Sequence, residues 1–568
     1  MPRALGWLAL ADLLERVRRR SFLIAALAML VVATLYLPAH GAPYITMTIG
    51  PDTRGIYDSA WIGAVTACLS SLMFSLAAFY LVRGSVERDE KTGFGQILAA
   101  TPVTKIEYVL GKTVSNFCYL AALTGLIALS GAAVQLVRGE DLAVDPIQLL
   151  LPTLVIVWPT MLLVAAVAVL FECVPLLKGG LGSVAYFALY LYAVAGLTVG
   201  NSVYERKPDP LGVGFALREM TLAGSGTAGA GTNPEPNIGV NTAPANIRTF
   251  DFAGIGWDTE TLLARLAWAS AALVAVLASA LFFSRFDPSR RPAVPASGVV
   301  PTGFQSWLPG SWGRNKNRPA EATQARAPDP APGTVDASSL APLDGRSAKG
   351  HFAPLVVAEL KLMLKGRSRL WYAGALGIVV AGLIVSPEDA RAIVLPIAWL
   401  WPLLLWSSLG CRENRFGTAE IVFSAPRIRT RGTLAALSAG AVVALLTASG
   451  VASNLALSGE TSGLFALVAG ALFVPALAVA CGVLSDGSTL FEGVYLPLWY
   501  LGPLNKVAAL DFAATSGPGH PLAYLALAAA LVATALAVRR GGWPPTNPRQ
   551  AIQAGFSADA VPPTRPLR

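Results

Sequence analysis

The sequence predicts an all-α, polytopic membrane protein, and three observations lead to that class. First, the chain has 568 residues, of which 54% are hydrophobic and only 14% are charged. Soluble domains contain about 25% charged residues. A single hydrophobic core in water stops growing at about 250–300 residues, so a soluble fold could not bury this much apolar surface. Second, apolar runs long enough to cross a bilayer recur along the chain. Third, Lys and Arg gather in alternate loops between these runs.

The apolar runs divide the chain into two halves of about six spans each, or about twelve in total. The first half covers residues 1–284 and the second covers residues 351–540. Residues 285–350 are rich in Pro and Arg and cannot support a packed core, so we expect a disordered cytoplasmic linker. Residues 541–568 are expected to form a disordered tail. The spans are expected at roughly residues 21–38, 60–82, 113–137, 148–171, 180–200 and 261–284, and at roughly residues 370–386, 391–410, 433–457, 462–483, 489–504 and 521–538.

Each half opens with a basic amphipathic segment. In residues 3–19, Leu10, Leu13, Leu14 and Val17 recur at the spacing of one helical face. Residues 352–369 again mix apolar and basic side chains. Helices of this composition lie in the membrane interface. We therefore expect an interfacial helix in front of each set of spans.

The distribution of Lys and Arg predicts the orientation in the membrane. These residues are concentrated on one side, which the positive-inside rule assigns to the cytoplasm. Both termini are then cytoplasmic, in a multi-pass protein of the cell (inner) membrane. The other side carries a large extracytoplasmic loop, residues 201–260. The same basic loops are expected to contact anionic membrane lipid, and their pattern does not fit nucleic-acid binding.

The strongest pattern in the chain is an internal repeat. Residues 88–105 (RDEKTGFGQILAATPVTK) align without a gap with residues 412–429 (RENRFGTAEIVFSAPRIR). Each copy follows the second expected span of its half, on the cytoplasmic side. Gly93 or Gly417 permits a turn, and an apolar pair then forms a turn or two of helix that ends at a proline. We expect two short, rigid protrusions, which we call the first knob (residues 88–105) and the second knob (residues 412–429).

The first knob and its continuation, ERDEKTGFGQILAATPVTKIEYVLGK, resemble the segment between the second and third spans of ABC-2-type permeases. These are the membrane subunits of ATP-binding-cassette exporters, and the resemblance covers most of the chain. It implies two fused six-helix ABC-2-type (type V exporter-like) repeats whose knobs are coupling helices that contact the ATPase. The second copy departs from the first at Asn414 and Phe416. The residues that the resemblance assigns to the ATPase contact are Glu90, Lys91, Gly93, Phe94, Gln96, Ile97, Leu98, Pro102, Arg415, Gly417, Thr418, Glu420, Ile421, Val422 and Pro426.

No ATP-binding motif occurs in the sequence itself. Gly111-Lys112-Thr113 lacks the earlier glycine of a phosphate-binding loop, because Ile106 stands at that position. The five cysteines form no CxxC pair and the three histidines are far apart in the sequence, so we expect no metal site. We also expect no cofactor and no enzymatic activity in this chain. ATP and Mg²⁺ are expected on two copies of a separate cytoplasmic ABC ATPase subunit.

Few ionisable residues fall inside the expected spans. The candidates are Glu172 and Glu492, either as structural groups near helix ends or on an ion path. Aromatic residues of the fifth and eleventh spans line a pathway, pack in the core or belong to an interfacial belt. They are Tyr186, Tyr190, Tyr192, Tyr495, Trp499 and Tyr500. The shortage of charge in the spans favours an exporter whose energy source lies outside the membrane. Its substrate would be hydrophobic or amphiphilic, such as a lipid or an antibiotic. The alternatives are an ion-coupled secondary transporter with two repeats and a permease that aids maturation of an exported protein.

Overall fold

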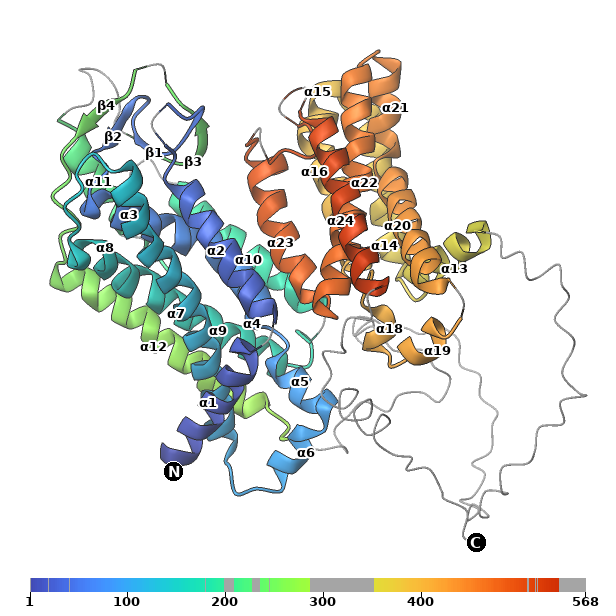
Figure 1. Cartoon of the computed structure of the whole chain (residues 1–568), viewed down its shortest axis with the longest axis horizontal. Helices are drawn as coiled ribbons and strands as arrows, with labels where there is room; N and C mark the ends of the chain where they lie inside the picture. Colours follow the sequence, from blue (N-terminus) through green and yellow to red (C-terminus); the bar gives the residue numbers. More distant parts are fainter. Residues whose placement is uncertain are drawn as a thin grey trace, which may run out of the picture.

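Two groups of helices stand side by side and correspond to the two halves of the sequence (Figure 1). The computed structural model describes residues 2–18, 20–39, 41–178, 180–198, 209–226, 235–244, 246–286, 352–425, 427–507, 510–515, 517 and 519–540. The expected linker and tail, residues 285–350 and 541–568, lie outside this part of the chain except for residues 285 and 286.

Helices dominate both halves. In the first half they are α1 (Pro2–Val17), α2 (Arg20–Tyr36), α3 (Ser59–Leu69), η1 (Ser70–Phe74), α4 (Ser75–Val82), α5 (Ser85–Thr92), α6 (Phe94–Ala99), α7 (Lys105–Arg138), α8 (Pro146–Pro152), η2 (Thr153–Val157), α9 (Trp158–Cys173), α10 (Gly180–Thr198), α11 (Val213–Gly224) and α12 (Thr259–Phe282). In the second half they are α13 (Phe352–Leu364), α14 (Arg369–Ile384), α15 (Pro387–Asp389), η5 (Ala390–Val394), α16 (Leu395–Leu400), α17 (Leu403–Trp406), α18 (Arg412–Arg415), α19 (Ala419–Phe423), α20 (Ile428–Thr447), α21 (Ser449–Leu457), α22 (Thr461–Ser485), α23 (Thr489–Trp499), η6 (Tyr500–Leu504) and α24 (Pro521–Arg540).

The described residues contain seven helices that are long and apolar enough to cross a membrane, so the chain is a multi-pass membrane protein by length and composition. These helices are Ser59–Glu90, Lys105–Arg138, Pro146–Cys173, Thr259–Phe282, Ile428–Thr447, Thr461–Ser485 and Pro521–Arg540. Each of the twelve expected spans coincides with a helix or a run of helices, but the other five are shorter or interrupted. Seven spans are therefore supported, and the number twelve stays a prediction.

Polar side chains set where several apolar helices begin. Asp58, Asp145 and Asp258 each accept hydrogen bonds from the first backbone N–H groups of α3, α8 and α12. At α7, Thr104 and Glu107 form a reciprocal capping box. Because unpaired N–H groups are costly at the edge of an apolar environment, each cap fixes the point at which a helix starts.

A small sheet corrects the expectation of an all-α fold. Strands β1 (Tyr44–Ile49), β2 (Thr53–Gly55), β3 (Pro236–Thr242) and β4 (Arg248–Phe250) lie in the order β3-β1-β2-β4. Strand β1 pairs antiparallel with β2 and β3, whereas β2 and β4 are parallel. The sheet joins the segment after α2 to the expected extracytoplasmic loop and lies at the upper end of the first half (Figure 1). Trp61 of α3 packs edge-on against Phe250 and Phe252 beneath it.

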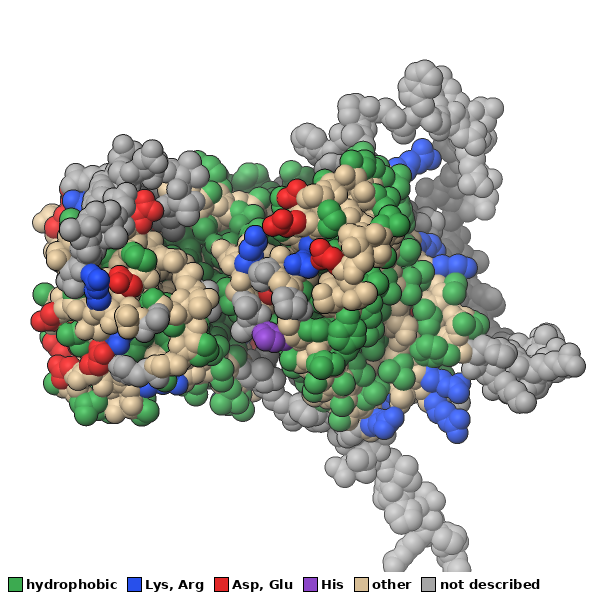
Figure 2. Space-filling view, turned by 90° about the horizontal axis from the view of Figure 1, so that it is seen from above, with side chains coloured by type: hydrophobic (Ala, Val, Ile, Leu, Met, Phe, Trp, Pro, Cys, Tyr) green, Lys and Arg blue, Asp and Glu red, His purple; other side chains and the backbone are tan. Residues whose placement is uncertain are grey.

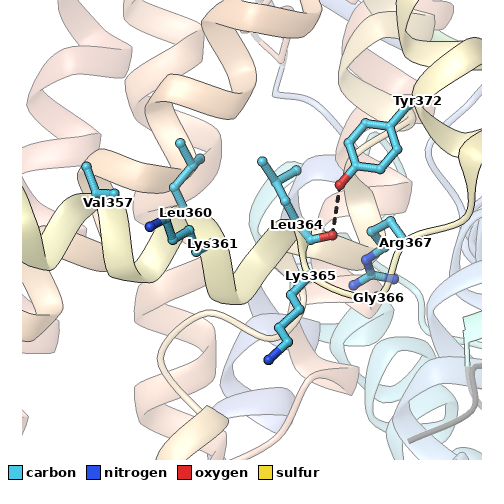
Figure 3. Close-up of a pocket in the computed structure, with 8 residues that line it drawn as sticks. All are labelled: Val357, Leu360, Lys361, Leu364, Lys365, Gly366, Arg367 and Tyr372. Carbon is cyan, nitrogen blue, oxygen red and sulfur yellow. Dashed lines mark hydrogen bonds between the residues drawn. The ribbon is translucent and has the colours of Figure 1, made fainter. Parts of the chain in front are cut away.

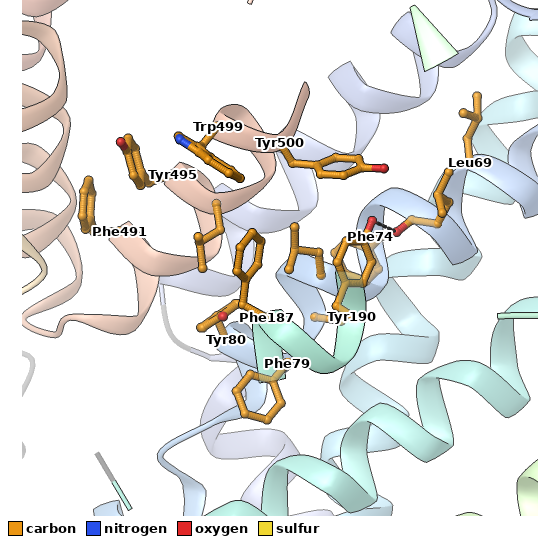
Figure 4. Packing of buried hydrophobic residues seen from close by; sticks show 14 of the residues in the cluster. Leu69, Phe74, Phe79, Tyr80, Phe187, Tyr190, Phe491, Tyr495, Trp499 and Tyr500 are labelled. Atoms are coloured by element: carbon orange, nitrogen blue, oxygen red, sulfur yellow. Dashed lines mark hydrogen bonds between the residues drawn. The ribbon is translucent and has the colours of Figure 1, made fainter. Parts of the chain in front are cut away.

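The two halves meet through α4 and α10 of the first half and α23 of the second. Phe187 packs against Trp499 with ring centroids 5.7 Å apart, and Tyr190 packs against Tyr500 at 5.8 Å (Figure 4). The hydroxyl of Tyr190 donates to the Leu72 carbonyl, and the indole N–H of Trp499 donates to the Pro396 carbonyl. These four aromatics are buried, which favours packing for Tyr190, Trp499 and Tyr500, whereas Tyr192 is 79% exposed.

Acidic side chains mark the end of the molecule that carries the sheet. Viewed onto that end, carboxylates lie over both halves and apolar side chains cover much of the flanks (Figure 2). Carboxylates at or beside helix and strand ends there include those of Asp52, Asp58, Glu140, Asp145, Asp258, Glu388, Asp389 and Glu460, and they outnumber the cations Arg54, Arg138, Arg248 and Arg391 at the same end. The opposite helix ends carry Lys105, Lys178, Lys361, Lys365, Arg429, Arg431, Arg539 and Arg540. The charge asymmetry read from the sequence therefore has a counterpart in space.

Close packing of α14 on α21 yields a first prediction. A Cβ at Gly450 would overlap the backbone carbonyl of Val379, so the two helices touch backbone to backbone. We expect Gly450→Leu to lower the free energy of unfolding by about 1–3 kcal/mol, because overpacking forces these helices apart. Thermal unfolding in detergent measures the effect. The matched control is Gly377→Leu on α14, where no atom lies within 4 Å of the added Cβ. Equal unfolding midpoints for the two variants would contradict the prediction.

Candidate functional site

The first knob consists of two short helices joined by a left-handed glycine. Helix α5 ends at Thr92, Gly93 has φ of 75°, and α6 begins at Phe94. The left-handed conformation favours glycine because a Cβ would be strained there. Helix α6 ends at Ala99, shortly before Pro102. The turn, the short helix and its termination follow the sequence prediction.

The second knob repeats this arrangement with fewer helical residues. Helices α18 and α19 flank Gly417, which has φ of 67°. Pro426 lies outside the described residues. Both knobs lie at the same end of the molecule, away from the sheet (Figure 1). The aligned glycines therefore occupy equivalent conformations at equivalent positions.

Several apolar side chains of the knobs are exposed although they lie outside the long apolar helices. The exposed fractions are 64% for Ile97 and 77% for Ile421, and Phe94 is also exposed. Other predicted contact residues are exposed as well, namely Gln96, Pro102, Arg415, Gly417, Thr418 and Glu420. Gly93, Leu98 and Val422 are half-buried, and Lys91 lies within α5. Half-buried Glu90 pairs with Lys178 at 3.5 Å. The predicted contact residues thus form two separate exposed surfaces, one per half.

A buried carboxylate holds the start of the first knob. Oε1 of Glu172, at the end of α9, accepts hydrogen bonds from the N–H groups of Gly84 and Ser85, at 2.8 and 3.1 Å. Its Oε2 accepts from those of Val86 and Glu87, at 2.6 and 3.2 Å. These are the N–H groups that have no partner within helix α5, and the negative charge also suits the N-terminus of a helix. Of the two roles open for Glu172, this geometry favours the structural one.

Glu492 has a different environment, at the junction of the two halves. Its carboxylate accepts a hydrogen bond of 2.8 Å from the hydroxyl of Ser183 on α10. Arg83, at the end of α4, donates to the same hydroxyl. Glu492 therefore links α23 of the second half to two helices of the first.

Beneath the first knob lies a buried ionic group that we call the Asp12 cluster, made of Asp12, Arg16, Arg88, Asp89 and Lys112. Oδ1 of Asp12, on α1, accepts from Lys112 at 2.6 Å and from Arg88 at 2.5 Å, and Oδ2 pairs with Arg16 at 3.0 Å. Lys112 also pairs with Asp89 at 2.8 Å. The cluster joins α1, α5 and α7 around one lysine.

The electrostatics of Asp12 follow from these partners. Burial raises the pKa of its carboxyl, but Arg16, Lys112 and Arg88 outweigh burial and hold the pKa well below its usual range. Asp12 is therefore ionised at neutral pH. Charged Asp12 and Arg16 face the bundle, whereas the apolar Leu10, Leu14 and Val17 are exposed, as expected for a helix whose apolar side meets lipid.

The second knob is tied to its own interfacial helix through the aligned arginine. Arg412, which aligns with Arg88, pairs with Glu359 of α13 at 2.8 Å. Glu413, which aligns with Asp89, lies 3.4 Å from Arg539 at the end of α24. In both halves the Arg-acid pair that opens the knob thus contacts the interfacial helix and one long helix.

These anchoring contacts were not predicted from the sequence. The aligned pairs Arg88-Asp89 and Arg412-Glu413 are visible in the repeat, and each interfacial helix contains an Ala-acid-Leu triplet around Asp12 or Glu359. The two signals together would have indicated the ion pairs. Glu172 was marked by its position inside an expected apolar span, but the sequence did not indicate its partners, the first N–H groups of α5.

Comparisons with known proteins found no matching family model, no matching curated protein and no matching solved structure. The likeness to ABC-2-type permeases therefore depends on the repeat and its surroundings alone.

The cap on α5 gives a second prediction. In Glu172→Gln, one face of the side chain presents an N–H₂ group to backbone donors, so part of the capping is lost. We expect hydrogen exchange at the amides of Ser85–Glu87 to become about 10–100-fold faster, which corresponds to about 1–3 kcal/mol. Exchange measured by mass spectrometry reports this region directly. The control is Glu107→Ala, which removes the Glu107 side of the capping box of α7 and leaves α5 intact. Similar acceleration at α5 in both variants would contradict the role of Glu172.

The Asp12 cluster gives a third prediction. We expect Asp12→Asn to lower stability by about 3–5 kcal/mol, because buried Lys112 and Arg16 lose charge compensation. The control is Glu15→Gln, whose side chain is 51% exposed and lies 3.8 Å from Arg88, and it should cost less than about 1 kcal/mol. Unfolding by denaturant in detergent compares the variants with wild type.

The pH dependence follows from the lowered pKa of Asp12. A carboxyl with a lowered pKa stabilises the fold fully above its pKa in the unfolded chain and loses this contribution only as acid approaches its pKa in the folded protein. The difference between wild type and Asp12→Asn should therefore stay constant from about pH 5 to pH 8. A difference that disappears within this range would contradict the assignment.

Proposed function

We propose that this chain is the membrane subunit of an ATP-driven exporter and that its knobs are the docking sites of two separate ABC ATPase subunits. The observation that carries the proposal is the pair of knobs. Each has a left-handed glycine at the aligned position, exposed apolar residues beyond it, and an arginine bonded to the interfacial helix of its own half. A loop that only connects two helices needs none of these three features in duplicate.

The proposed orientation places the knobs in the cytoplasm, where ATP is available. It is supported by the gathering of Lys and Arg at the helix ends beside the knobs and of carboxylates at the opposite end. In this orientation both termini are cytoplasmic and the sheet is extracytoplasmic, in a protein of the cell (inner) membrane.

The proposed topology has twelve spans in two six-helix repeats of the ABC-2 type. Beyond the seven long apolar helices, the remaining five spans would be α2, α10, α14 and two interrupted segments, residues 390–406 and 489–504. The interrupted segments contain π-helical turns and are largely buried against other helices. Irregular backbone is tolerated at membrane depth when protein surrounds it, which supports including them.

The proposed mechanism transmits motion from the knobs to the spans. ATP and Mg²⁺ bind the partner ATPase, and closure of two ATPase subunits displaces the knobs. Because Glu172 and the Asp12 cluster fasten the first knob to α9, α1 and α7, this displacement moves those helices as one body. The halves then rock about the aromatic contact of α10 with α23, which opens a route for a hydrophobic or amphiphilic substrate.

A fourth prediction tests the knobs as docking sites. We expect the double variant Ile97→Ser, Ile421→Ser to lose at least about tenfold of the vanadate-sensitive ATP hydrolysis that co-purifies with the wild-type chain, since buried apolar anchors dominate docking energy. The matched control is Leu142→Ser, which replaces another exposed apolar residue, 58% accessible, in the loop between α7 and α8. Membrane insertion and the unfolding temperature are measured for all variants.

Two outcomes would overturn the proposed function. One is ATP hydrolysis that co-purifies equally with the double variant and the control. The other is transport that survives ATP depletion and stops when the proton or sodium gradient is dissipated, which would identify an ion-coupled carrier.

A further inference from the structure

A cavity of about 530 Å³ lies in the second half where the interfacial helix α13 bends into α14 (Figure 3). Its lining combines apolar side chains and cations from eight consecutive or neighbouring positions. The lining residues are Val357, Leu360, Lys361, Leu364, Lys365, Gly366, Arg367 and Tyr372. Gly366 has φ of 82°, which makes the bend, and the hydroxyl of Tyr372 closes one side by donating to the Leu364 carbonyl at 2.9 Å.

Three cations line this cavity without an acidic neighbour. Within the part of the chain that the structure describes, no carboxylate lies within ion-pair distance of Lys361, Lys365 or Arg367. The nearest acidic residue along α13, Glu359, is engaged by Arg412. Lys361 lies in the last turn of α13 and Lys365 directly follows that helix, with its backbone N–H donating to the Lys361 carbonyl at 2.8 Å. Two like charges four residues apart in such a turn repel each other. An anion in the cavity would remove that repulsion.

The apolar wall determines which anion fits. Val357, Leu360 and Leu364 recur along one side of α13, so the apolar strip leads to Lys365 and Arg367 at the bend. An inorganic anion would bind the cations but would leave the apolar strip exposed to solvent or lipid. A molecule with an anionic headgroup and an acyl chain uses both parts.

The position of the cavity agrees with such a ligand. Helix α13 is the interfacial helix of the second half, and α14 begins an apolar helix at Arg369. The bend therefore lies at the depth of lipid headgroups, on the side of the molecule where cations gather. Basic segments at this depth attract anionic lipid.

We propose that the cavity at the α13–α14 bend is a binding site for an anionic phospholipid, with the phosphate at the bend beside Lys365 and Arg367, Lys361 one helical turn away as a further cation, and one acyl chain along Val357, Leu360 and Leu364. The bound lipid fixes the angle between α13 and α14. The site does not depend on what the knobs bind, so it is tested without the ATPase.

The experiment uses the full chain in phosphatidylcholine micelles doped with phosphatidylglycerol that carries a diazirine on one acyl chain. After illumination, mass spectrometry of peptides should find crosslinks on α13 between Val357 and Leu364. Unlabelled phosphatidylglycerol should compete for them, whereas phosphatidylcholine and glycerol 3-phosphate should not. Competition by glycerol 3-phosphate at equal concentration would identify a site for free phosphate compounds and overturn the lipid assignment.

The decisive variant is Lys361→Gln, Lys365→Gln, Arg367→Gln, in which labelling of α13 should fall at least about tenfold. Its matched control removes three cations of the same side elsewhere, Arg18→Gln, Lys105→Gln and Arg427→Gln, and should label like wild type. The conservative variant Lys361→Arg, Lys365→Arg should retain labelling. Equal loss in the first variant and the control would mean general surface attraction and would overturn the site.

A deletion of residues 300–340 tests the linker as a competing occupant. Labelling of α13 should be unchanged by the deletion. Labelling that occurs only in the shortened chain would mean that the linker, and not a lipid, fills the cavity in the intact protein.

Discussion

The arrangement of the first half depends on one buried lysine. Lys112 lies between Asp12 and Asp89, and through them it joins the interfacial helix, the first knob and the longest apolar helix. A buried ion cluster gains little net energy, because desolvation opposes attraction. The cluster instead fixes the relative positions of the helices, because each charged group is stabilised only where it meets its partners. A shift of α1 or α5 along α7 would leave a buried charge unpaired.

Glu172 adds a second constraint that acts mainly on backbone, with the hydroxyl of Ser85 as one further donor at 3.2 Å. Its carboxylate accepts hydrogen bonds from the first N–H groups of α5, so the axis of that helix is fixed relative to α9. Together the two contacts turn a short surface helix into an extension of the helix bundle. This is a physical requirement for any segment proposed to transmit force, because a flexible loop would absorb the displacement locally.

The sequence predicted the helices and the knobs well because both leave local patterns. Each expected apolar run coincides with a helix or a run of helices, and the aligned glycines predicted the turns at Gly93 and Gly417. Helix α11, inside the expected extracytoplasmic loop, was not predicted. The sheet could not be predicted in the same way, because β1 and β3 are separated by most of the first half. The inward-facing charge of α1 was also missed. Periodicity gives the two faces of a helix but not which face meets protein, and here the apolar face, with Leu10 and Leu14, is the exposed one.

Although they share a pattern, the two knobs are fastened unequally. The first has a carboxylate cap and a five-residue cluster, whereas the second has Arg412 with Glu359 and Glu413 with Arg539, and its helices are shorter. In a pair of identical subunits both levers would have the same stiffness. When two halves are joined in one chain, that symmetry is no longer required. In the proposed exporter, equal forces from two ATPase subunits therefore displace the two sets of helices unequally. The less firmly attached second knob moves relative to its helices, whereas the first knob transmits most of the force to the helices of the first half.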